Sequence, residues 1–486
     1  MNRRELLIGA SATGIAVDAA LPRIDAAAFG VTGDGRTDDA AAIQAALDHA
    51  GSRGGGVVRL PLPKVHYRIA SGLVLPSHVS LEGEAPVTYS FNAGNAGACA
   101  LVADFADPNL WMVETATRTG GRRIGFNKVM SGALPDGVTY NCGVRNLLLT
   151  SKGKIPYGGI RMHGCPGSFV DGVSIDRVGC GLLVNHCSGG TYRANVRALY
   201  YGVAAWDEAN GNVFQVYCTQ STPWPKTVPP SYQLPFMAQM AGHFADTLKL
   251  SSDAHGERPY GILCGSIAST STGNAFDAVI ERFAGGLFLY NAYAADFRQC
   301  YLESEESGMV CALTASRSRF SIQSLHVYLS GSGALFDFGI DVTAKIFVSG
   351  ILDAASFGKP PLDDGSSLLL IEGISPPMHG APLQRGIRYA GKIPEWIDLS
   401  LRSGWRPAGE VPAVRVDPWS YRVEWKGSIA GGQAGVACVL PPSCRPPRRG
   451  RYRVAGGQVE ITPDGVVTVQ PDDVTVDLDS IGFSRW

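Results

Sequence analysis

A repeat of about 22 residues constrains the fold of this 486-residue chain more than any other feature. In each copy an aromatic residue is followed, about four residues later, by an apolar one and then by a glycine and an apolar-x-apolar stretch. Such a period, with short alternating strands and glycine-containing turns, is typical of a solenoid whose coils stack on one another. The aromatic positions are, in chain order, Phe169, Tyr192, Phe214, Phe276, Phe297 and Phe320.

The length of the repeat indicates the kind of solenoid. Two or three strands of four to five residues, with their turns, use about 22 residues, which is roughly one coil of a parallel β-helix. Leucine-rich repeats have a similar period, but their regular leucine and asparagine positions are missing here. With 60 glycines and 30 prolines, long helices are also disfavoured. We therefore expect an all-β chain with a parallel β-helix as its main part.

The segment from Asp25 to Ile69 resembles the opening of the pectate-lyase-like β-helix superfamily, which includes polygalacturonase-like enzymes and phage tailspike depolymerases. The resemblance implies a right-handed parallel β-helix over residues 23–390, with an N-terminal helix, ending near His49, that covers the open end of the solenoid. Asp34, Asp38 and Asp39 are interpreted as turn and capping residues. The matching residues are Phe29-Gly30, Gly33-Asp34-Gly35, Thr37-Asp38-Asp39, Ala42-Ile43-Gln44-Ala45-Ala46 and Gly54-Gly55-Gly56.

The N-terminus indicates export. Residues 1–22 hold Arg3-Arg4 followed by a mildly apolar run, and so resemble a twin-arginine signal peptide, which predicts a periplasmic or extracellular protein. No later apolar run approaches the roughly 20 residues of a membrane helix. Charged residues make up 17% of the chain and the net charge is −1, so no bulk attraction to nucleic acid or to a membrane is expected.

The C-terminal part is predicted to be a separate module. Residues 391–412 are interpreted as a linker rich in Gly and Pro. Residues 413–486 resemble a small β-sandwich found at the C-terminus of many phage tail-fibre proteins, with short strands separated by Gly and Pro turns. The resemblance implies trimerisation or receptor contact, so a homotrimer is considered. Matching pieces are Gly427-Ser428, Gly431-Gly432, Leu440-Pro441, Arg445-Pro446, Val459-Glu460-Ile461, Asp464-Gly465 and Leu478-Asp479-Ser480-Ile481.

The eleven cysteines match no zinc-ligand spacing. Cys165 and Cys187, one repeat apart, are interpreted as stacked interior thiols, with a disulfide along the stack as the alternative. Cys438 and Cys444 are the best disulfide candidates in the chain.

A column of polar residues follows from aligning the coils. Stacked coils are about 4.8 Å apart, so Glu281 and Glu303 are expected to be direct neighbours. Earlier in the column, Lys154, Asp176 and Arg197 should form a surface ladder of alternating charge. Like charges repel, so one of two adjacent carboxylates holds a proton more readily. Glycoside hydrolysis needs such a protonated acid beside an ionised partner. The alternative is a solvated acidic turn. The column comprises Lys154, Asp176, Arg197, Gly256, Glu281 and Glu303.

An insertion at about residues 219–258 interrupts the repeat. Long excursions from a solenoid often form the wall of a binding groove, and this one carries aromatic residues suited to stacking on sugars. Secondary catalytic candidates are Asp253, His255 and Glu305. Candidate substrate-binding residues are Trp206, Asp207, Trp224, Tyr232, Arg282 and Arg298.

These features predict an exported enzyme that cleaves an extracellular polysaccharide, either a glycoside hydrolase or a polysaccharide lyase. A lyase would use Arg298, Arg282 or a tyrosine near Tyr260 as its base. The motifs that the resemblance would bring for a polygalacturonase are absent from their expected context. No acidic cluster has calcium-ligand spacing, so no cofactor is expected and calcium is left open. The alternative is a non-catalytic, trimeric glycan-binding spike protein.

Overall fold

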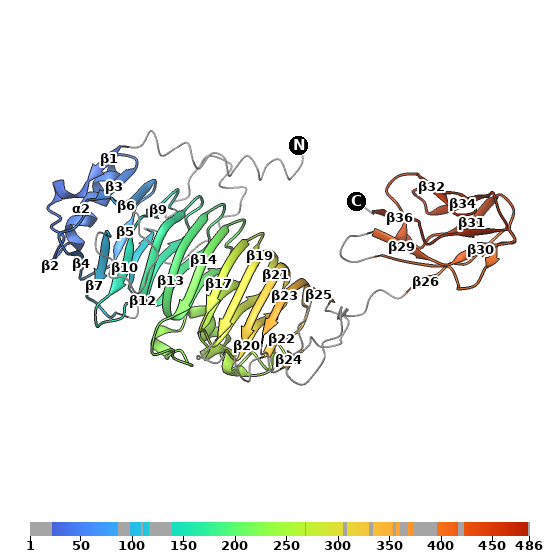
Figure 1. Ribbon diagram of the computed structural model, residues 1–486. Helices are drawn as coiled ribbons and strands as arrows, with labels where there is room; N and C mark the ends of the chain where they lie inside the picture. The colour runs from blue at the N-terminus through green and yellow to red at the C-terminus, as the bar shows by residue number, and fades with distance from the viewer. Residues whose placement is uncertain are drawn as a thin grey trace. The chain divides into compact units, whose positions relative to one another are not determined.

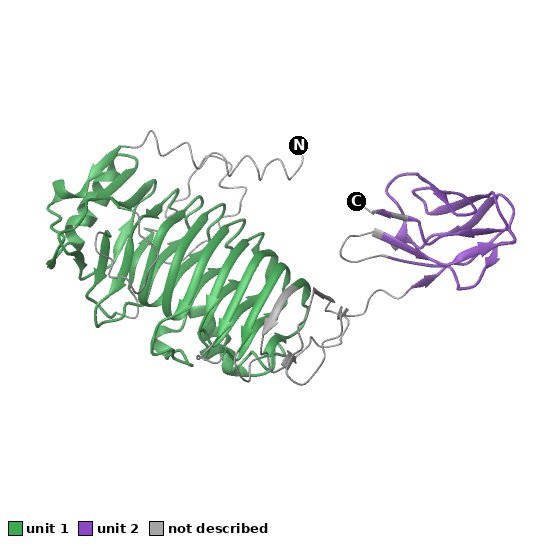
Figure 2. Cartoon of the chain, viewed as in Figure 1, with its two compact units in different colours: residues 1–389 green, residues 390–486 purple. Residues whose placement is uncertain are grey.

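The computed structural model describes residues 22–85, 98–107, 110–115, 139–267, 269–304, 309–329, 334–352, 356–359, 368–373, 396–416 and 422–484. The predicted signal peptide, apart from Pro22, and the candidate Glu305 lie outside these residues. The chain divides into two compact units, residues 1–389 and 390–486 (Figure 2). Among the described helices, none is long and apolar enough to cross a membrane.

Unit 1 is the parallel β-helix that the repeat predicts (Figure 1). Each strand pairs in parallel with a strand of the next coil, in two series that form two sides of the solenoid. The first series is β14 (Val213–Gln220), β17 (Ala275–Glu281), β19 (Ala292–Ser304), β21 (Arg319–Leu329), β23 (Thr343–Leu352) and β25 (Leu368–Gly373). The second is β15 (Tyr260–Gly265), β18 (Gly285–Tyr290), β20 (Cys311–Ser316), β22 (Ala334–Phe338) and β24 (Ser356–Lys359).

The earlier coils join both series. The long strand β13 (Thr191–Trp206) pairs with β14 of the first series and with β15 of the second, and the equally long β12 (Phe169–Asn185) pairs with β13. The short strand β16 (Ser271–Thr272) pairs with the start of β19. Shorter strands precede them: β1 (Arg23–Asp25), β2 (Asp34–Asp38), β3 (Gly56–Leu60), β4 (His66–Ile69), β5 (Leu73–Leu75), β6 (Val79–Gly83), β7 (Ala100–Ala103), β8 (Trp111–Thr115), β9 (Gly143–Arg145), β10 (Leu148–Ser151) and β11 (Gly158–His163).

The helix α2 (Ala40–Ser52) lies at the N-terminal end of the coil stack, as the resemblance implies (Figure 1). It buries Ile43 and Leu47 against the first coils, after a short 3-10 helix η1 (Ala26–Phe29). The turn before it needs Gly33 and Gly35, whose φ angles of 59° and 73° favour glycine. Asp34 holds this turn: the backbone N–H groups of Arg36 and Thr37 lower its pKa to about 2. These contacts agree with a turn role for the acidic residues here.

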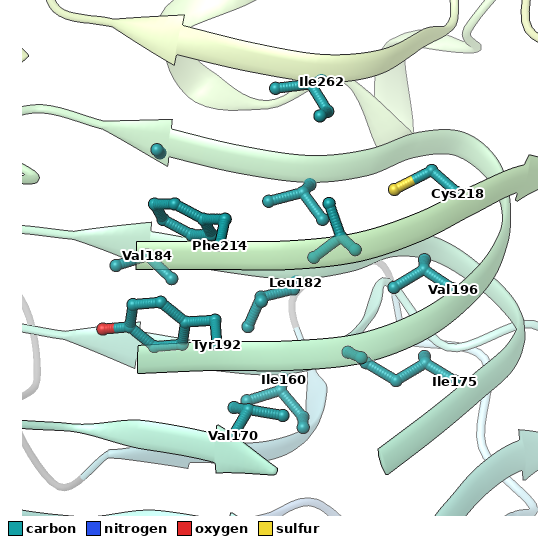
Figure 3. Packing of buried hydrophobic residues seen from close by; sticks show 14 of the residues in the cluster. Ile160, Val170, Ile175, Leu182, Val184, Tyr192, Val196, Phe214, Cys218 and Ile262 are labelled. Atoms are coloured by element: carbon teal, nitrogen blue, oxygen red, sulfur yellow. The ribbon is translucent and has the colours of Figure 1, made fainter. Parts of the chain in front are cut away.

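The interior of unit 1 is a continuous apolar core in which similar side chains stack from coil to coil (Figure 3). Tyr192, Phe214, Phe276 and Phe297 occupy one column in strand register. Their successive ring centroids are 4.9, 4.6 and 4.7 Å apart. This separation matches the spacing of neighbouring strands, so the backbone ladder itself sets the ring stack.

Two predicted members of the aromatic column lie elsewhere. Val170 pairs with Tyr192 in the column, and Phe169 lies on the outer side, where the Arg145 guanidinium carbon is 4.8 Å from its ring centroid. Ile322 pairs with Phe297, so Phe320 is also out of register, although it is buried. Side chains alternate between the two faces of a strand, so an offset of one residue moves a ring from the core to the surface.

The two positions of these rings predict different costs of substitution. Phe276→Leu keeps an apolar side chain but removes a stacked ring, so it should lower the free energy of unfolding by roughly 1–1.5 kcal/mol. Phe169→Leu, which touches no other ring of the column, is the matched control and should change it by less than about 0.5 kcal/mol. Chemical denaturation measures the change in unfolding free energy of both variants. Equal changes would contradict the strand register that places Phe276 in the ring column and Phe169 outside it.

All eleven cysteines are buried, and none of them forms a disulfide. The backbone N–H of Cys165 donates to Sγ of Cys187 at 3.3 Å, which confirms the interpretation of these residues as stacked interior thiols. Burial raises the pKa of Cys187 to about 12, so this thiol stays protonated. Cys438 and Cys444, the disulfide candidates, are both buried in the core of unit 2 and form no disulfide, so that prediction is wrong.

The excursion between β14 and β15 builds a second apolar core. It contains η2 (Pro230–Tyr232), α4 (Pro235–Met240) and η3 (Asp253–Glu257). Its Phe236 and Phe244 pack with Trp206, Tyr260 and Phe288, which project outward from β13, β15 and β18. The excursion therefore covers the outer face of the second series of strands. The sequence predicted that the excursion forms the wall of a binding groove, whereas its Phe236 and Phe244 pack on this second series.

Unit 2 consists of three antiparallel sheets around its own core, which includes Trp405, Val414 and Trp425. Residues 396–412, assigned to a linker from the sequence, belong to this unit, because Leu399 and Trp405 are buried in that core. Its elements are β26 (Ile397–Asp398), β27 (Arg406–Pro407), β28 (Ala413–Val416), β29 (Arg422–Lys426), β30 (Ser428–Ala430), β31 (Gly435–Val439), η4 (Pro442–Cys444), β32 (Gly450–Val454), β33 (Gly457–Ile461), β34 (Val466–Pro471), β35 (Thr475–Asp477) and β36 (Gly482–Ser484).

Candidate functional site

The outer face of β14, β17, β19 and β21 gathers polar side chains in columns. Since alternate residues of a strand face outward, strand register places equivalent positions side by side. One column holds Tyr217, Val279, Tyr301 and His326. Two residues further along the same strands, a second column holds Thr219, Glu281, Glu303 and Tyr328.

Glu281 and Glu303 are direct neighbours in this second column, so their predicted adjacency is confirmed. Both side chains are partly exposed. The Tyr217 hydroxyl donates a hydrogen bond to Oε2 of Glu281, and the Tyr301 hydroxyl donates to Oε2 of Glu303 at 2.7 Å. The result is two tyrosine–glutamate pairs side by side on neighbouring coils.

The earlier part of the predicted column is partly wrong. Asp176 and Arg197 are neighbours as expected and form a bidentate ion pair, with Nη2 of Arg197 2.7 Å from Oδ2 of Asp176. Lys154 lies in the bend after β10, where Nζ is 3.7 Å from Oδ1 of Asp104. The position between Arg197 and Glu281 is occupied by Thr219. Gly256, which was assigned to it, lies in the excursion, because β14 supplies this coil before the excursion begins.

An open groove of about 610 Å³ runs beside the two glutamates over the same four strands. The rings of Tyr301 and His326 stack within it, with centroids 5.3 Å apart and an interplanar angle of 11°. At its edge, Nη2 of Arg298 is 2.7 Å from Oδ2 of Asp277. The groove is lined by Gln215, Val216, Asp277, Ala278, Val279, Gln299, Cys300, Tyr301, Ser324 and His326.

The sequence analysis missed the tyrosines and the histidine of this face. Tyr217 and Tyr301 stand two residues before Thr219 and Glu303, so the period-2 pattern that put the glutamates outside could also have put these two beside them. His326 could be found only after the register between β19 and β21 was known, since β21 is paired through a bulge.

Two candidate sugar platforms of the sequence analysis pack against the second apolar core and do not line the groove, Trp206 buried and Tyr232 partly buried. Trp206 is 1% exposed, and its ring stacks on Phe236 with centroids 3.8 Å apart. Tyr232 donates its hydroxyl to the Ile155 carbonyl at 2.8 Å and stacks on Tyr157. Asp207 accepts a hydrogen bond from Oγ of Ser266 at 2.8 Å, in a turn beyond the end of β13. Packing under the excursion therefore decides where Trp206 and Tyr232 lie.

His255 and Asp253 also have structural surroundings. His255 is 0% exposed, with Nε2 2.8 Å from Oδ2 of Asp337 and Nδ1 2.6 Å from the Tyr260 hydroxyl. Asp253 accepts a hydrogen bond from the Ala245 backbone at 2.9 Å within the excursion. Neither residue lines the groove, so the structure does not support them as catalytic groups there.

Two further candidates lie next to the carboxylate pair. Arg282 follows Glu281 at the end of β17, and its backbone N–H donates to the Glu303 carbonyl at 2.9 Å. Its guanidinium carbon is 5.4 Å from the ring centroid of Trp224, which comes from the start of the excursion. The excursion thus reaches the candidate site through Trp224.

The family-model comparison matches the N-terminal part of the chain. Residues 24–121 match the family model described as rhamnogalacturonase A/epimerase, pectate lyase-like, which confirms the resemblance to the pectate-lyase-like superfamily. Alginate lyase 7 of Azotobacter vinelandii is 45% identical over 62 residues. That match covers 11% of this chain and 7% of the relative, so the chain spans a small part of that protein's length.

Solved structures of similar fold include proteins of different kinds. A mutant tailspike protein of E. coli bacteriophage HK620, in complex with a pentasaccharide, has a TM-score of 0.48 and 10% identity, covering 93% of this chain and 92% of that one. The A-module of the mannuronan C-5 epimerase AlgE6 of Azotobacter vinelandii has a TM-score of 0.38 and 14% identity, covering 73% and 99%. The surface protein and adhesin PfbA of Streptococcus pneumoniae has a TM-score of 0.40 and 12% identity, covering 73% of this chain and 96% of that one. With TM-scores below 0.5, none of these likenesses bears on the site.

Proposed function

We propose that this pectate-lyase-like β-helix is an exported enzyme that cleaves an extracellular polysaccharide on the outer face of β14, β17, β19 and β21. The observation that carries the proposal is the register pair of Glu281 and Glu303, each bonded to a tyrosine, beside an open groove. The family-model match and the short stretch shared with an alginate lyase support a polysaccharide as the substrate.

The chemistry that best fits the pair is hydrolysis. One glutamic acid gives its proton to the leaving glycosidic oxygen, while the other, ionised, takes a proton from water or attacks the anomeric carbon. The glycosidic C–O bond breaks and an oxygen of water ends on the anomeric carbon. The tyrosine hydroxyls hold the two carboxylates in place, and the stacked rings of Tyr301 and His326 provide a surface for a sugar.

Tyr301→Phe tests the proposed positioning. The variant loses a hydrogen bond to a charged group, worth about 1.5–3 kcal/mol, so kcat should fall by roughly tenfold or more with little change in KM. Tyr293→Phe on the same strand is the control, since its ring lies under Arg319 and away from the glutamates. Equal rates for the two variants would mean that Tyr301 does not position Glu303.

The experiment that tests the function is incubation with a panel of bacterial and plant polysaccharides. New reducing ends are followed together with the ultraviolet absorbance of unsaturated uronates. Reducing ends alone indicate a hydrolase. Reducing ends with the absorbance indicate a lyase, in which Tyr301 or Arg298 would take the place of the glutamates as base. If none of the polymers is cleaved, that result contradicts the proposed enzymatic function.

The second candidate function is a non-catalytic, trimeric glycan-binding spike protein. The resemblance of residues 413–486 to tail-fibre modules favours it, and unit 2 has its own core and three antiparallel sheets. Binding to a polysaccharide of the panel without any cleavage, by a protein that sediments as a trimer, is the result expected for this alternative.

A further inference from the structure

The groove beside the glutamates is lined without lysine or arginine. Its polar lining, all within the described residues, consists of Gln215, Asp277, Gln299, Tyr301, Ser324 and His326. Amides and hydroxyls both donate and accept hydrogen bonds, so they match the hydroxyl and N-acyl groups of sugars. A uronate needs a cation instead, usually an arginine that binds the carboxylate with two donors.

Two arginines beside the groove and the glutamates already have partners. Arg298 is held by Asp277, and the Arg282 guanidinium lies over the Trp224 ring. A uronate that approached Arg298 would meet the Asp277 carboxylate at the same place, and Glu281 and Glu303 lie in the next column. Like charges brought together across an interface repel each other, so the groove disfavours an anionic sugar.

The coils before the groove show the opposite balance on the same face. Asp171 pairs with both Arg145 and Arg193, and Asp176 with both Arg197 and Arg177, so arginines outnumber carboxylates there. The contrast shows that cations are absent from the groove in particular and are not rare on this face of the β-helix.

We propose that the sugar bound in the groove is uncharged, a neutral or N-acylated hexose, and that the reaction is therefore hydrolysis. The inference rests on the proposed function, because it takes the Glu281–Glu303 pair as the cleaving groups. β-Elimination requires a carboxyl group at C5 of the sugar to acidify the neighbouring proton, and an uncharged hexose has none.

The test uses three uronate polymers, alginate, polygalacturonate and hyaluronan, each with its carboxyl-reduced form of the same linkage. Binding is measured by affinity electrophoresis at low and high salt, and cleavage by reducing ends in the same mixtures. The wild type should bind at least one reduced form about tenfold more tightly than its uronate parent, with little salt dependence. Gln299→Arg, which adds a cation to the groove, should reverse this preference, whereas Gln323→Arg outside the groove should not.

The outcomes separate this inference from the proposed function. Binding of a reduced form without cleavage would support the uncharged sugar and contradict the enzyme. Cleavage of a uronate polymer with release of unsaturated ends would overturn the uncharged sugar while keeping polysaccharide cleavage. Tighter binding of the uronate parents, or binding to no member of any pair, would overturn the inference as well.

Discussion

Glu303→Gln is expected to lower kcat for polysaccharide cleavage by roughly 10³-fold while the affinity for the polymer stays unchanged. The amide keeps the size of the side chain and can still accept the Tyr301 hydrogen bond, but it cannot give up or take a proton at neutral pH. Glu281→Gln should have a similar effect. The double variant should be little slower than either single one, because two groups that act as a unit are not additive.

Asp176→Asn provides the matched control. Asp176 stands in the same outward column as the glutamates, three coils before Glu281, and is paired with Arg197. Its loss should leave kcat unchanged. Initial rates and polymer affinity are measured for all four variants on the polysaccharide found in the panel. A Glu303→Gln enzyme with the wild-type rate would falsify the catalytic role of the pair and leave a solvated acidic face.

His255→Ala is expected to lower the free energy of unfolding of unit 1 by about 3–5 kcal/mol. The imidazole is fully buried between the excursion and β22, where it bridges Asp337 and Tyr260. Nδ1 also faces Nη1 of Arg258 at 3.1 Å, and an arginine can only donate, so Nδ1 accepts and Nε2 carries the proton donated to Asp337. Removing the ring leaves a cavity and strips a buried carboxylate of its strongest neutral donor.

Urea denaturation of the full chain measures this effect. His243→Ala is the control, an exposed histidine of the same excursion whose loss should cost less than about 0.5 kcal/mol. Unit 2 has its own core, so its transition should not move in either variant. Limited proteolysis should cut the excursion faster in His255→Ala, because the bridge ties it to the strands. Equal stability of the two variants would contradict the bridge.

The same contact predicts a pH dependence. Burial by itself raises the pKa of Asp337, but hydrogen bonds from His255 and Ser251 outweigh it and hold this pKa below its ordinary value. A carboxylate of this kind stabilises the fold above its unfolded pKa of about 3.9, and the stabilisation is lost as pH falls through the lowered folded value. The difference in unfolding free energy between wild type and Asp337→Asn should therefore shrink at acid pH.

The sequence by itself determined the solenoid and the neighbouring glutamates. A coil of nearly constant length places each residue beside its equivalent one repeat later. The 22-residue step from Glu281 to Glu303 therefore predicted that these two residues pair, with no need to know how the other coils are arranged. The same reasoning found the stacked thiols and most of the aromatic column, because these positions depend on local period and strand alternation alone.

Only the tertiary structure decided which residues the excursion buries and which it leaves exposed. The composition of the excursion gave no indication of which face of the β-helix it would cover. It covers the second series of strands because Phe236 and Phe244 are buried there against Trp206 and Phe288. Because of that packing, Trp206 and His255 are buried and Tyr232 is partly buried, whereas Glu281 and Glu303 stay partly exposed. Contacts between segments far apart in the chain follow from the apolar area that they bury, which no periodicity in the sequence records.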